Sequence, residues 1–197
     1  MKIILLFLSV FLLSSCTLLP NKSNISENLN LTSTPSTTVS NQISSVPSSI
    51  APSGQDVVAL NTKYGQIVIK LSRKDAPNSV NNFIKKVESG FYNGLIFHRV
   101  EPDFVVQGGD PLGNGTGGGN QKSEINSNTF VKGSVGLARG PDKEVTNDSQ
   151  FFICLTTENC QSLTGDYVNI GEVISGMEFV GKIKVRDKII EFTNKTK

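Results

Sequence analysis

The stretch FHRVEPDFVVQGGDP, residues 97–111, restricts the fold more than any other part of this chain. Two short apolar runs, 96–100 and 105–109, are separated by residues typical of a turn, which predicts two β-strands. Arg99 lies in the first run and Gln107 in the second, each among apolar neighbours. An arginine in such a place usually forms a salt bridge or extends its charge to solvent. The pattern alone therefore leaves the role of this pair open.

A glycine-rich loop, GNGTGGG at 113–119, follows directly. It contains the spacing GxGxxG, which in dinucleotide-binding folds opens a helix after a strand. Residues 120–123 begin no apolar helical period, and Gln121 stands where a phosphate-binding loop requires glycine before its lysine. Nucleotide binding is therefore a weak alternative.

Most of the chain after residue 55 is predicted to form short strands. In segment 66–71 the apolar residues alternate, with Ile67, Ile69 and Leu71 on one face. The eight predicted strands cover residues 57–61, 66–71, 96–100, 105–109, 134–138, 151–155, 168–173 and 184–192. Strands far outnumber helices and do not alternate with them, which favours a mainly β domain, a closed eight-stranded antiparallel barrel capped by helix.

One helix is clear between residues 75 and 90. Asp75 is a candidate N-cap, Pro77 suits the first turn, and Gly90 ends the helix. The apolar residues at helical spacing are Val80, Phe83, Ile84 and Val87. A shorter helix is expected at 176–181.

The first sixteen residues are typical of a targeting segment rather than of a folded core. After Lys2, residues 3–13 form a mostly apolar run, which is too short to span a bilayer, since a spanning helix needs about 20 residues. The run ends in LSSC, which resembles the lipobox of bacterial lipoproteins, in which the cysteine, here Cys16, receives a lipid. We therefore expect residues 1–16 to be a lipoprotein signal peptide. An ordinary signal peptide is the alternative.

Residues 17–55 are expected to form a disordered tether. Of the 33 residues from 21 to 53, 10 are serine, 4 threonine, 5 asparagine and 3 proline. Such a composition buries too little apolar surface to offset the entropy of ordering. A flexible chain of this length reaches roughly 35 Å, so it would lift a folded domain, residues 56–197, clear of a lipid surface.

Charge and cysteine content exclude some classes of function. The formal net charge is +2 and no long run of basic residues occurs, so nucleic-acid binding has little support. The one histidine, His98, and the absence of paired CxxC spacing argue against a metal site. Whether Cys154 and Cys160 form a disulfide is left open, because spacing alone does not show that they meet.

Several motifs together resemble the cyclophilins. Residues 97–118 resemble the most characteristic signature of that family. The segments GSVGLAR at 133–139 and SQFFI at 149–153 resemble its second signature, in order and at compatible spacing. The likeness covers about residues 57–185, nearly the whole predicted domain.

The resemblance implies an eight-stranded barrel capped by two helices and a peptidyl-prolyl cis-trans isomerase that uses no cofactor and no metal. By motif position, Arg99 is the catalytic arginine, and Gln107 orients it together with Gln150. The residues implied to surround the proline and the substrate residues before it are Phe104, Val105, Ala138, Arg139, Phe152, Leu163 and Tyr167. The implied partners are proline-containing peptides and unfolded exported proteins, bound by a monomer anchored to a bacterial membrane outside the cytoplasm.

Three hypotheses follow from these observations. The leading one is an active isomerase, which the presence of both Arg99 and Gln107 favours. The second is a binding or chaperone module that keeps the fold but has negligible turnover. The third is the nucleotide-dependent enzyme, which the missing strand–loop–helix context disfavours.

Overall fold

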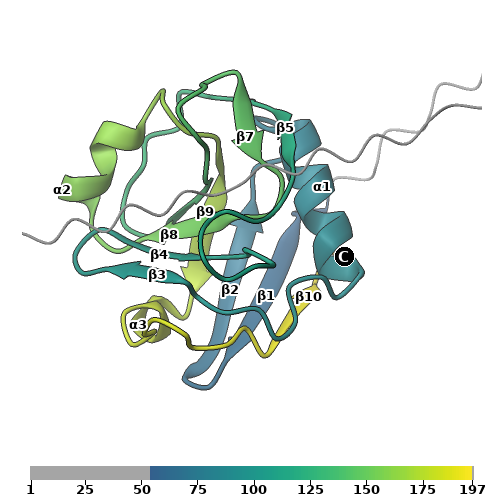
Figure 1. Cartoon of the computed structure of the whole chain (residues 1–197), viewed down its shortest axis with the longest axis vertical. Coiled ribbons are helices and arrows are strands. Elements are labelled where there is room, and N and C mark those ends of the chain that lie inside the picture. Colours follow the sequence, from purple (N-terminus) through teal and green to yellow (C-terminus); the bar gives the residue numbers. More distant parts are fainter. Residues whose placement is uncertain (1–53, 197) are drawn as a thin grey trace, which may run out of the picture. The chain divides into compact units, whose positions relative to one another are not determined.

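A strongly curled eight-stranded antiparallel sheet dominates the computed structural model, which describes residues 54–196 (Figure 1). The predicted signal peptide, with Cys16, and nearly all of the predicted tether lie outside these residues. The strand order is β10-β1-β2-β9-β6-β8-β4-β3. The strands of this sheet are β1 (Val57–Thr62), β2 (Gly65–Leu71), β3 (Arg99–Glu101), β4 (Val105–Gly108), β6 (Ser134–Leu137), β8 (Phe151–Cys154), β9 (Asn169–Ser175) and β10 (Glu191–Asn194). No helix among the described residues is long and apolar enough to cross a bilayer.

The prediction of a closed barrel is wrong, because the sheet is an open half-barrel. Its edge strands, β10 and β3, do not pair with each other. The predicted strand at 184–192 is mostly wrong, because a tight turn at 184–187 occupies its first part and β10 shares only residues 191–192 with it before continuing to Asn194. A single bridge between Ile96 and Lys188, with a few backbone hydrogen bonds beside it, joins the two sides. Irregular segments therefore fill the place where a ladder would close the barrel.

Two strands and one helix were not predicted. β5 (Asn120–Lys122) pairs with β7 (Val145–Asn147) as a separate two-stranded sheet. Both are short and polar, so neither shows the alternation that marks a strand in a sequence. The four-residue helix α2 (Thr157–Cys160) precedes a 3-10 turn, η1 (Gln161–Leu163).

The long helix forms as predicted, but its N-terminus is capped from elsewhere. Helix α1 (Pro77–Glu88) has Pro77 in its first turn, whereas Asp75 makes no capping hydrogen bond. Instead Glu124 accepts hydrogen bonds from the backbone N–H groups of Asn78 (3.1 Å) and Ser79 (2.7 Å). A carboxylate is favourable there because the first N–H groups of a helix lack partners and carry partial positive charge. The second predicted helix is α3 (Met177–Val180).

The core lies between α1 and the concave face of the sheet. It is centred on aromatic rings that meet edge to face or tilted, with centroids 5.2–6.4 Å apart. These rings are Phe83, Tyr92, Phe97, Phe151 and Phe192. Because Phe151 points into this core, the next residue on β8 points to the opposite face of the sheet. That opposite face carries the pocket.

Candidate active site

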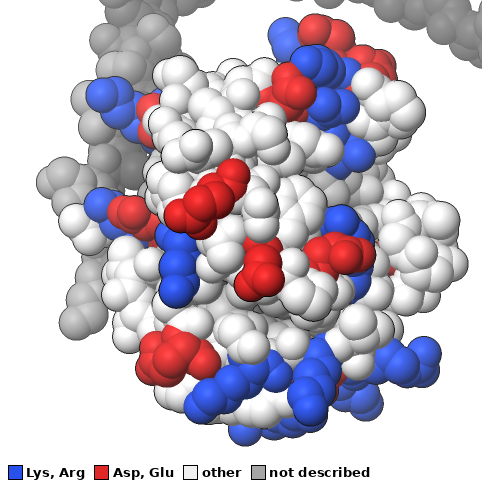
Figure 2. All heavy atoms as spheres, turned by 90° about the vertical axis from the view of Figure 1, so that its left-hand side faces the viewer, with Lys and Arg blue, Asp and Glu red and all other residues white. Residues whose placement is uncertain are grey.

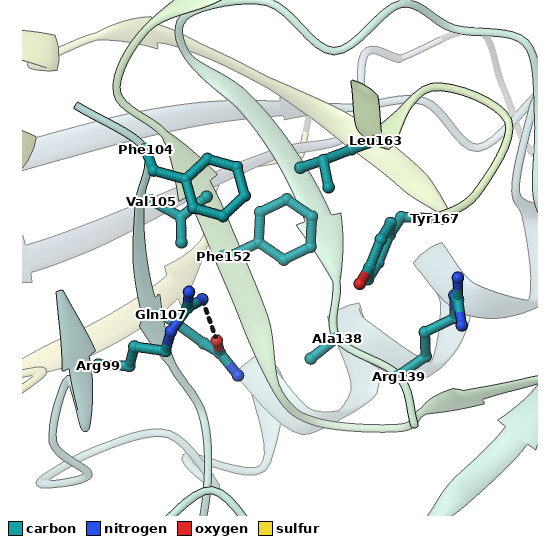
Figure 3. Close-up of a pocket in the computed structure, with 9 residues that line it drawn as sticks. All are labelled: Arg99, Phe104, Val105, Gln107, Ala138, Arg139, Phe152, Leu163 and Tyr167. Carbon is teal, nitrogen blue, oxygen red and sulfur yellow. Dashed lines mark hydrogen bonds between the residues drawn. The ribbon is translucent and has the colours of Figure 1, made fainter. Parts of the chain in front are cut away.

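One pocket gathers nine of the ten residues that the sequence predicts for catalysis and substrate binding (Figure 3). It has a volume of about 250 Å³ and opens to solvent. Its lining residues are Arg99, Phe104, Val105, Gln107, Ala138, Arg139, Phe152, Leu163 and Tyr167. They come from β3, β4, β8, the end of β6 and the segment around η1, which are far apart in sequence. The tenth residue, Gln150, lies in an adjoining pocket that shares Gln107.

The apolar side of the pocket is a small second core. Figure 3 shows Phe104, Phe152 and Leu163 around one hollow, with Val105 at its base. Phe130 stacks beneath Phe152 with ring centroids 5.6 Å apart, and it was not predicted. Its only sequence signal is an isolated aromatic residue in a polar stretch. This side therefore suits a compact apolar ring.

A glycine beneath these rings makes the packing possible. A methyl group on Gly136 would lie 2.4 Å from Phe152 and 2.8 Å from Phe130. Both distances are far below van der Waals contact, so any larger residue would have to displace both rings. Gly136 thereby leaves room for the stacked pair of Phe130 and Phe152.

The polar side is a chain of hydrogen bonds that ends on Arg99. Gln150 donates from Nε2 to the carbonyls of Gly115 (3.1 Å) and Gly117 (2.8 Å). Its Oε1 then accepts from Gln107 Nε2 at 3.0 Å, which leaves Gln107 Oε1 to accept from the Arg99 guanidinium at 3.3 Å. Because both amide protons of Gln150 are used, each amide has one favourable orientation. The network thus orients the Gln107 Oε1 acceptor toward the Arg99 guanidinium.

The guanidinium of Arg99 remains available to a ligand. It lies 5.7 Å from the centre of the Phe104 ring, and its side chain is 41% exposed. Glu101, two residues along the same strand, lies 3.6 Å from Arg99 Nε. This acidic neighbour was not predicted, although its i+2 spacing on a strand places it on the same face as Arg99. Arg99 therefore presents a fixed cation beside the apolar ring site.

Arg139 and Tyr167 form the far rim of the pocket. The Arg139 guanidinium lies 4.6 Å from the Tyr167 ring centre and donates to the backbone carbonyls of Asp166 (2.6 Å) and Gly140 (2.8 Å). Lys143 pairs with Asp166 beside it. Most Arg139 donors are thus engaged within the protein, so the contribution of Arg139 to the rim is to hold Tyr167 in place.

The glycine-rich loop is held by the protein itself. The carboxylate of Asp110 accepts hydrogen bonds from the N–H groups of Leu112, Asn114 and Gly115. A strand, β5, follows the loop where a dinucleotide site needs a helix. These N–H groups are therefore used internally, which argues against the nucleotide hypothesis.

A disulfide between Cys154 and Cys160 lies under the apolar side of the pocket. Both residues are completely buried, and they pack in the same cluster as Val105 and Phe152. Cys154 is the last residue of β8, and Cys160 immediately precedes η1, which carries Leu163. The bond therefore ties the segment that carries Leu163 to the sheet.

Replacing both cysteines by alanine should lower stability and weaken substrate binding. Closing a loop this short stabilises a fold by about 2 kcal/mol. Loss of the bond frees the segment around Leu163, so we expect KM for a prolyl peptide to rise more than kcat falls. Kinetics and urea unfolding of residues 55–197 measure both effects. A dithiol reductant should reproduce them in the parent protein and leave the double variant unchanged. An unaltered KM in the double variant would contradict this role for the disulfide.

His98 is the only histidine of the chain and immediately precedes Arg99. Neither ring nitrogen has a hydrogen-bond partner within the described residues, and both are buried. Burial lowers the pKa of His98 below its ordinary value; Asp110 opposes this shift, and the charge of Arg99 adds to it. The folded protein therefore disfavours the charged imidazole.

Stability should accordingly fall as the pH is lowered through the unfolded-state pKa of His98, which is about 6.5. Above the unfolded-state pKa both states hold a neutral ring, so no effect is expected there. Below it the unfolded chain takes up the proton more readily, which favours unfolding until the folded-state pKa is passed. Denaturant unfolding at a series of pH values measures this slope, and His98→Gln should flatten it. Equal slopes in both proteins would show that His98 is not the cause.

The open half-barrel carries a pocket that places a fixed cation beside an apolar ring site, which suits a ligand with a compact apolar ring next to polar groups. The sequence profile described as cyclophilin type peptidyl-prolyl cis-trans isomerase/CLD matches residues 57–195. This chain therefore belongs to the family of cyclophilin-type peptidyl-prolyl cis-trans isomerases, enzymes also called rotamases.

Two bacterial relatives illustrate the sequence similarity. The chain is 42% identical over 137 residues to a peptidyl-prolyl cis-trans isomerase of Helicobacter pylori, a match that covers 66% of this chain and 81% of the relative. It is 38% identical over 156 residues to a probable peptidyl-prolyl cis-trans isomerase of Brucella suis, covering 72% and 78% respectively.

Solved structures agree with the fold. A cyclophilin-type isomerase of Cryptosporidium parvum matches with a TM-score of 0.66 and 29% identity, over 73% of this chain and 99% of that one. Its structure in the presence of the dipeptide Ala-Pro matches with a TM-score of 0.61 and 31% identity, over 71% of this chain and 96% of that one. The match spans nearly all of the Cryptosporidium chain, so in that protein the fold occurs without a further domain.

Proposed function

We propose that this protein accelerates rotation about X-Pro peptide bonds in exported proteins at the bacterial cell envelope, assisting their folding. The observation that carries the catalytic part is the Arg99 guanidinium beside the hollow formed by Phe104, Phe152 and Leu163. The presence of Ala-Pro with a structural relative supports a prolyl dipeptide as the minimal ligand.

The chemistry needs no nucleophile, metal or proton transfer. The barrier to rotation, about 18–20 kcal/mol, comes from amide resonance. In the twisted state the imide nitrogen regains its lone pair, and a permanently charged guanidinium placed beside it stabilises that state more than the planar one. The apolar wall holds the proline ring, and the polar chain through Gln107 holds Arg99. Catalysis then consists of holding the proline ring in the apolar hollow while the preorganised charge of Arg99 stabilises the twisted state.

Residues 55–197 with a proline tetrapeptide provide the test. Uncatalysed isomerisation takes tens to hundreds of seconds, and we expect catalytic amounts of the domain to shorten it, as measured by NMR exchange or a protease-coupled assay. Binding of the peptide without faster exchange would favour the chaperone module instead. The complete polar chain from Gln150 to Arg99 is the observation that favours turnover.

The location at the envelope rests on the N-terminal sequence and on the disulfide. Residues 3–13 and the motif LSSC support export followed by lipidation of Cys16. A buried disulfide is typical of proteins that fold in an oxidising compartment. Mass analysis of the mature protein tests this directly. We expect a diacylglyceryl group on an N-terminal Cys16, and an unmodified cysteine would contradict the anchor.

A further inference from the structure

Five cationic side chains gather at the end of the domain formed by the β1–β2 turn and the segment after α3. Figure 2 shows blue side chains crowded at the lower end of the molecule, where Figure 1 places these two segments. The five are Lys63, Lys182, Lys184, Arg186 and Lys188, and all are exposed. We call this surface the basic end. Asp187 lies among them and pairs with Lys63 at 2.6 Å, and two further exposed carboxylates, Glu178 and Glu191, lie in the adjoining α3 and β10.

The fold brings these two segments together through specific contacts. The Phe179 ring of α3 packs against Gly65, where a methyl group would lie only 2.6 Å from the ring. The Asp187 N–H donates to the Lys184 carbonyl at 3.0 Å, which closes a tight turn, and Asp187 Oδ2 accepts from the Lys184 N–H at 2.9 Å. Arg186 adopts a φ of 73° in that turn. The cations are therefore fixed on one surface rather than scattered along a loose loop.

Exposed apolar side chains lie between these cations. Val185, at the tip of the turn, is 53% exposed, and Ile190 is 57% exposed. Cations interspersed with exposed aliphatic residues suit the boundary between lipid headgroups and acyl chains. A surface for single-stranded nucleic acid would instead offer open aromatic faces for stacking. The two aromatic rings at the basic end, Tyr64 and Phe179, are half-buried and have Lys63 and Lys182 over them, 5.0 and 5.5 Å from the ring centres.

We propose that the basic end docks the domain on an anionic phospholipid bilayer. Each lysine or arginine near such a surface strengthens binding about fivefold, and insertion of Val185 adds an apolar contribution. None of the five cations lines the candidate pocket, so substitutions at the basic end leave the pocket lining unchanged. The domain from residue 55 onward lacks Cys16, so its binding to a bilayer can be measured without a contribution from an acyl group.

Sedimentation of residues 55–197 with lipid vesicles tests the proposal. The vesicles consist of phosphatidylcholine with or without phosphatidylglycerol, at low and high salt. One triple variant removes cations from the basic end: Lys182→Gln, Lys184→Gln and Lys188→Gln. The matched control removes three exposed lysines from elsewhere: Lys74→Gln, Lys85→Gln and Lys195→Gln. Both variants have the same net charge, and both should keep the isomerase activity of the parent on a soluble peptide.

We expect binding to phosphatidylglycerol vesicles that falls with salt, at least about tenfold weaker for the basic-end variant and nearly unchanged for the control. Val185→Ser, introduced alone into the parent protein, should also weaken binding to the vesicles. Equal loss in the two triple variants would reduce the effect to net charge and overturn the proposal. So would an absence of vesicle binding, or tighter binding to a single-stranded oligonucleotide than to vesicles. Because activity is measured separately, failure here leaves the proposed isomerase function untouched.

Discussion

Arg99→Ala should lower kcat/KM for a proline tetrapeptide at least tenfold, and by as much as about 100-fold if the guanidinium acts as a typical preorganised donor. The guanidinium is the only cation on the ring-binding side of the described pocket, and it lies beside Phe104. Its interaction strengthens as the imide nitrogen regains its lone pair, so the loss should appear mainly in kcat. The protease-coupled assay or NMR exchange measures both constants.

Two controls separate chemistry from folding. Arg99 contacts Gln107 and the partly exposed Glu101, and exposed pairs contribute about 0–1 kcal/mol. Urea unfolding of Arg99→Ala should therefore match that of the parent within about 1 kcal/mol. Arg99→Lys keeps the charge but loses the planar fork, and it should recover only part of the activity. Full activity in Arg99→Ala would contradict the proposed role of the Arg99 guanidinium in catalysis.

Phe151→Ala should lower the free energy of unfolding by about 3–5 kcal/mol. The Phe151 ring is completely buried and meets four other aromatic rings, with centroids 5.7–6.4 Å away. Alanine leaves a cavity between α1 and the sheet that rigid aromatic neighbours fill poorly. Since the free energy of unfolding of a whole domain is about 5–15 kcal/mol, this single substitution removes a large share of the stability. Urea denaturation measures it.

Phe151→Leu is the matched control. It keeps most of the volume and should cost less than about 1.5 kcal/mol. Because Phe151 faces the core and Phe152 the pocket, Phe151→Leu should leave KM for the peptide unchanged, whereas Phe152→Leu should raise it. A loss below about 1 kcal/mol in Phe151→Ala would mean that the core repacks around the gap.

Local sequence patterns predicted much of the fold, and they failed where local signal was weak. Strand alternation and helical spacing identified β2 and α1 close to their observed limits. The prediction of Asp75 as the N-cap of α1 was wrong, because the helix is capped by Glu124, which lies far along the chain. The polar strands β5 and β7 were missed, since three residues of mixed polarity show no period.

The amino-acid sequence by itself determined the family and singled out the ten candidate site residues, because their types and order recur as motifs that can be read without coordinates. Only the tertiary structure decided that the sheet stays open between β3 and β10, that Cys154 and Cys160 bond, and that Glu101 and Phe130 support the site. It also decided that Lys63 joins the cations after α3. These features depend on distances between segments remote in the chain, and local periodicity carries no information about such distances.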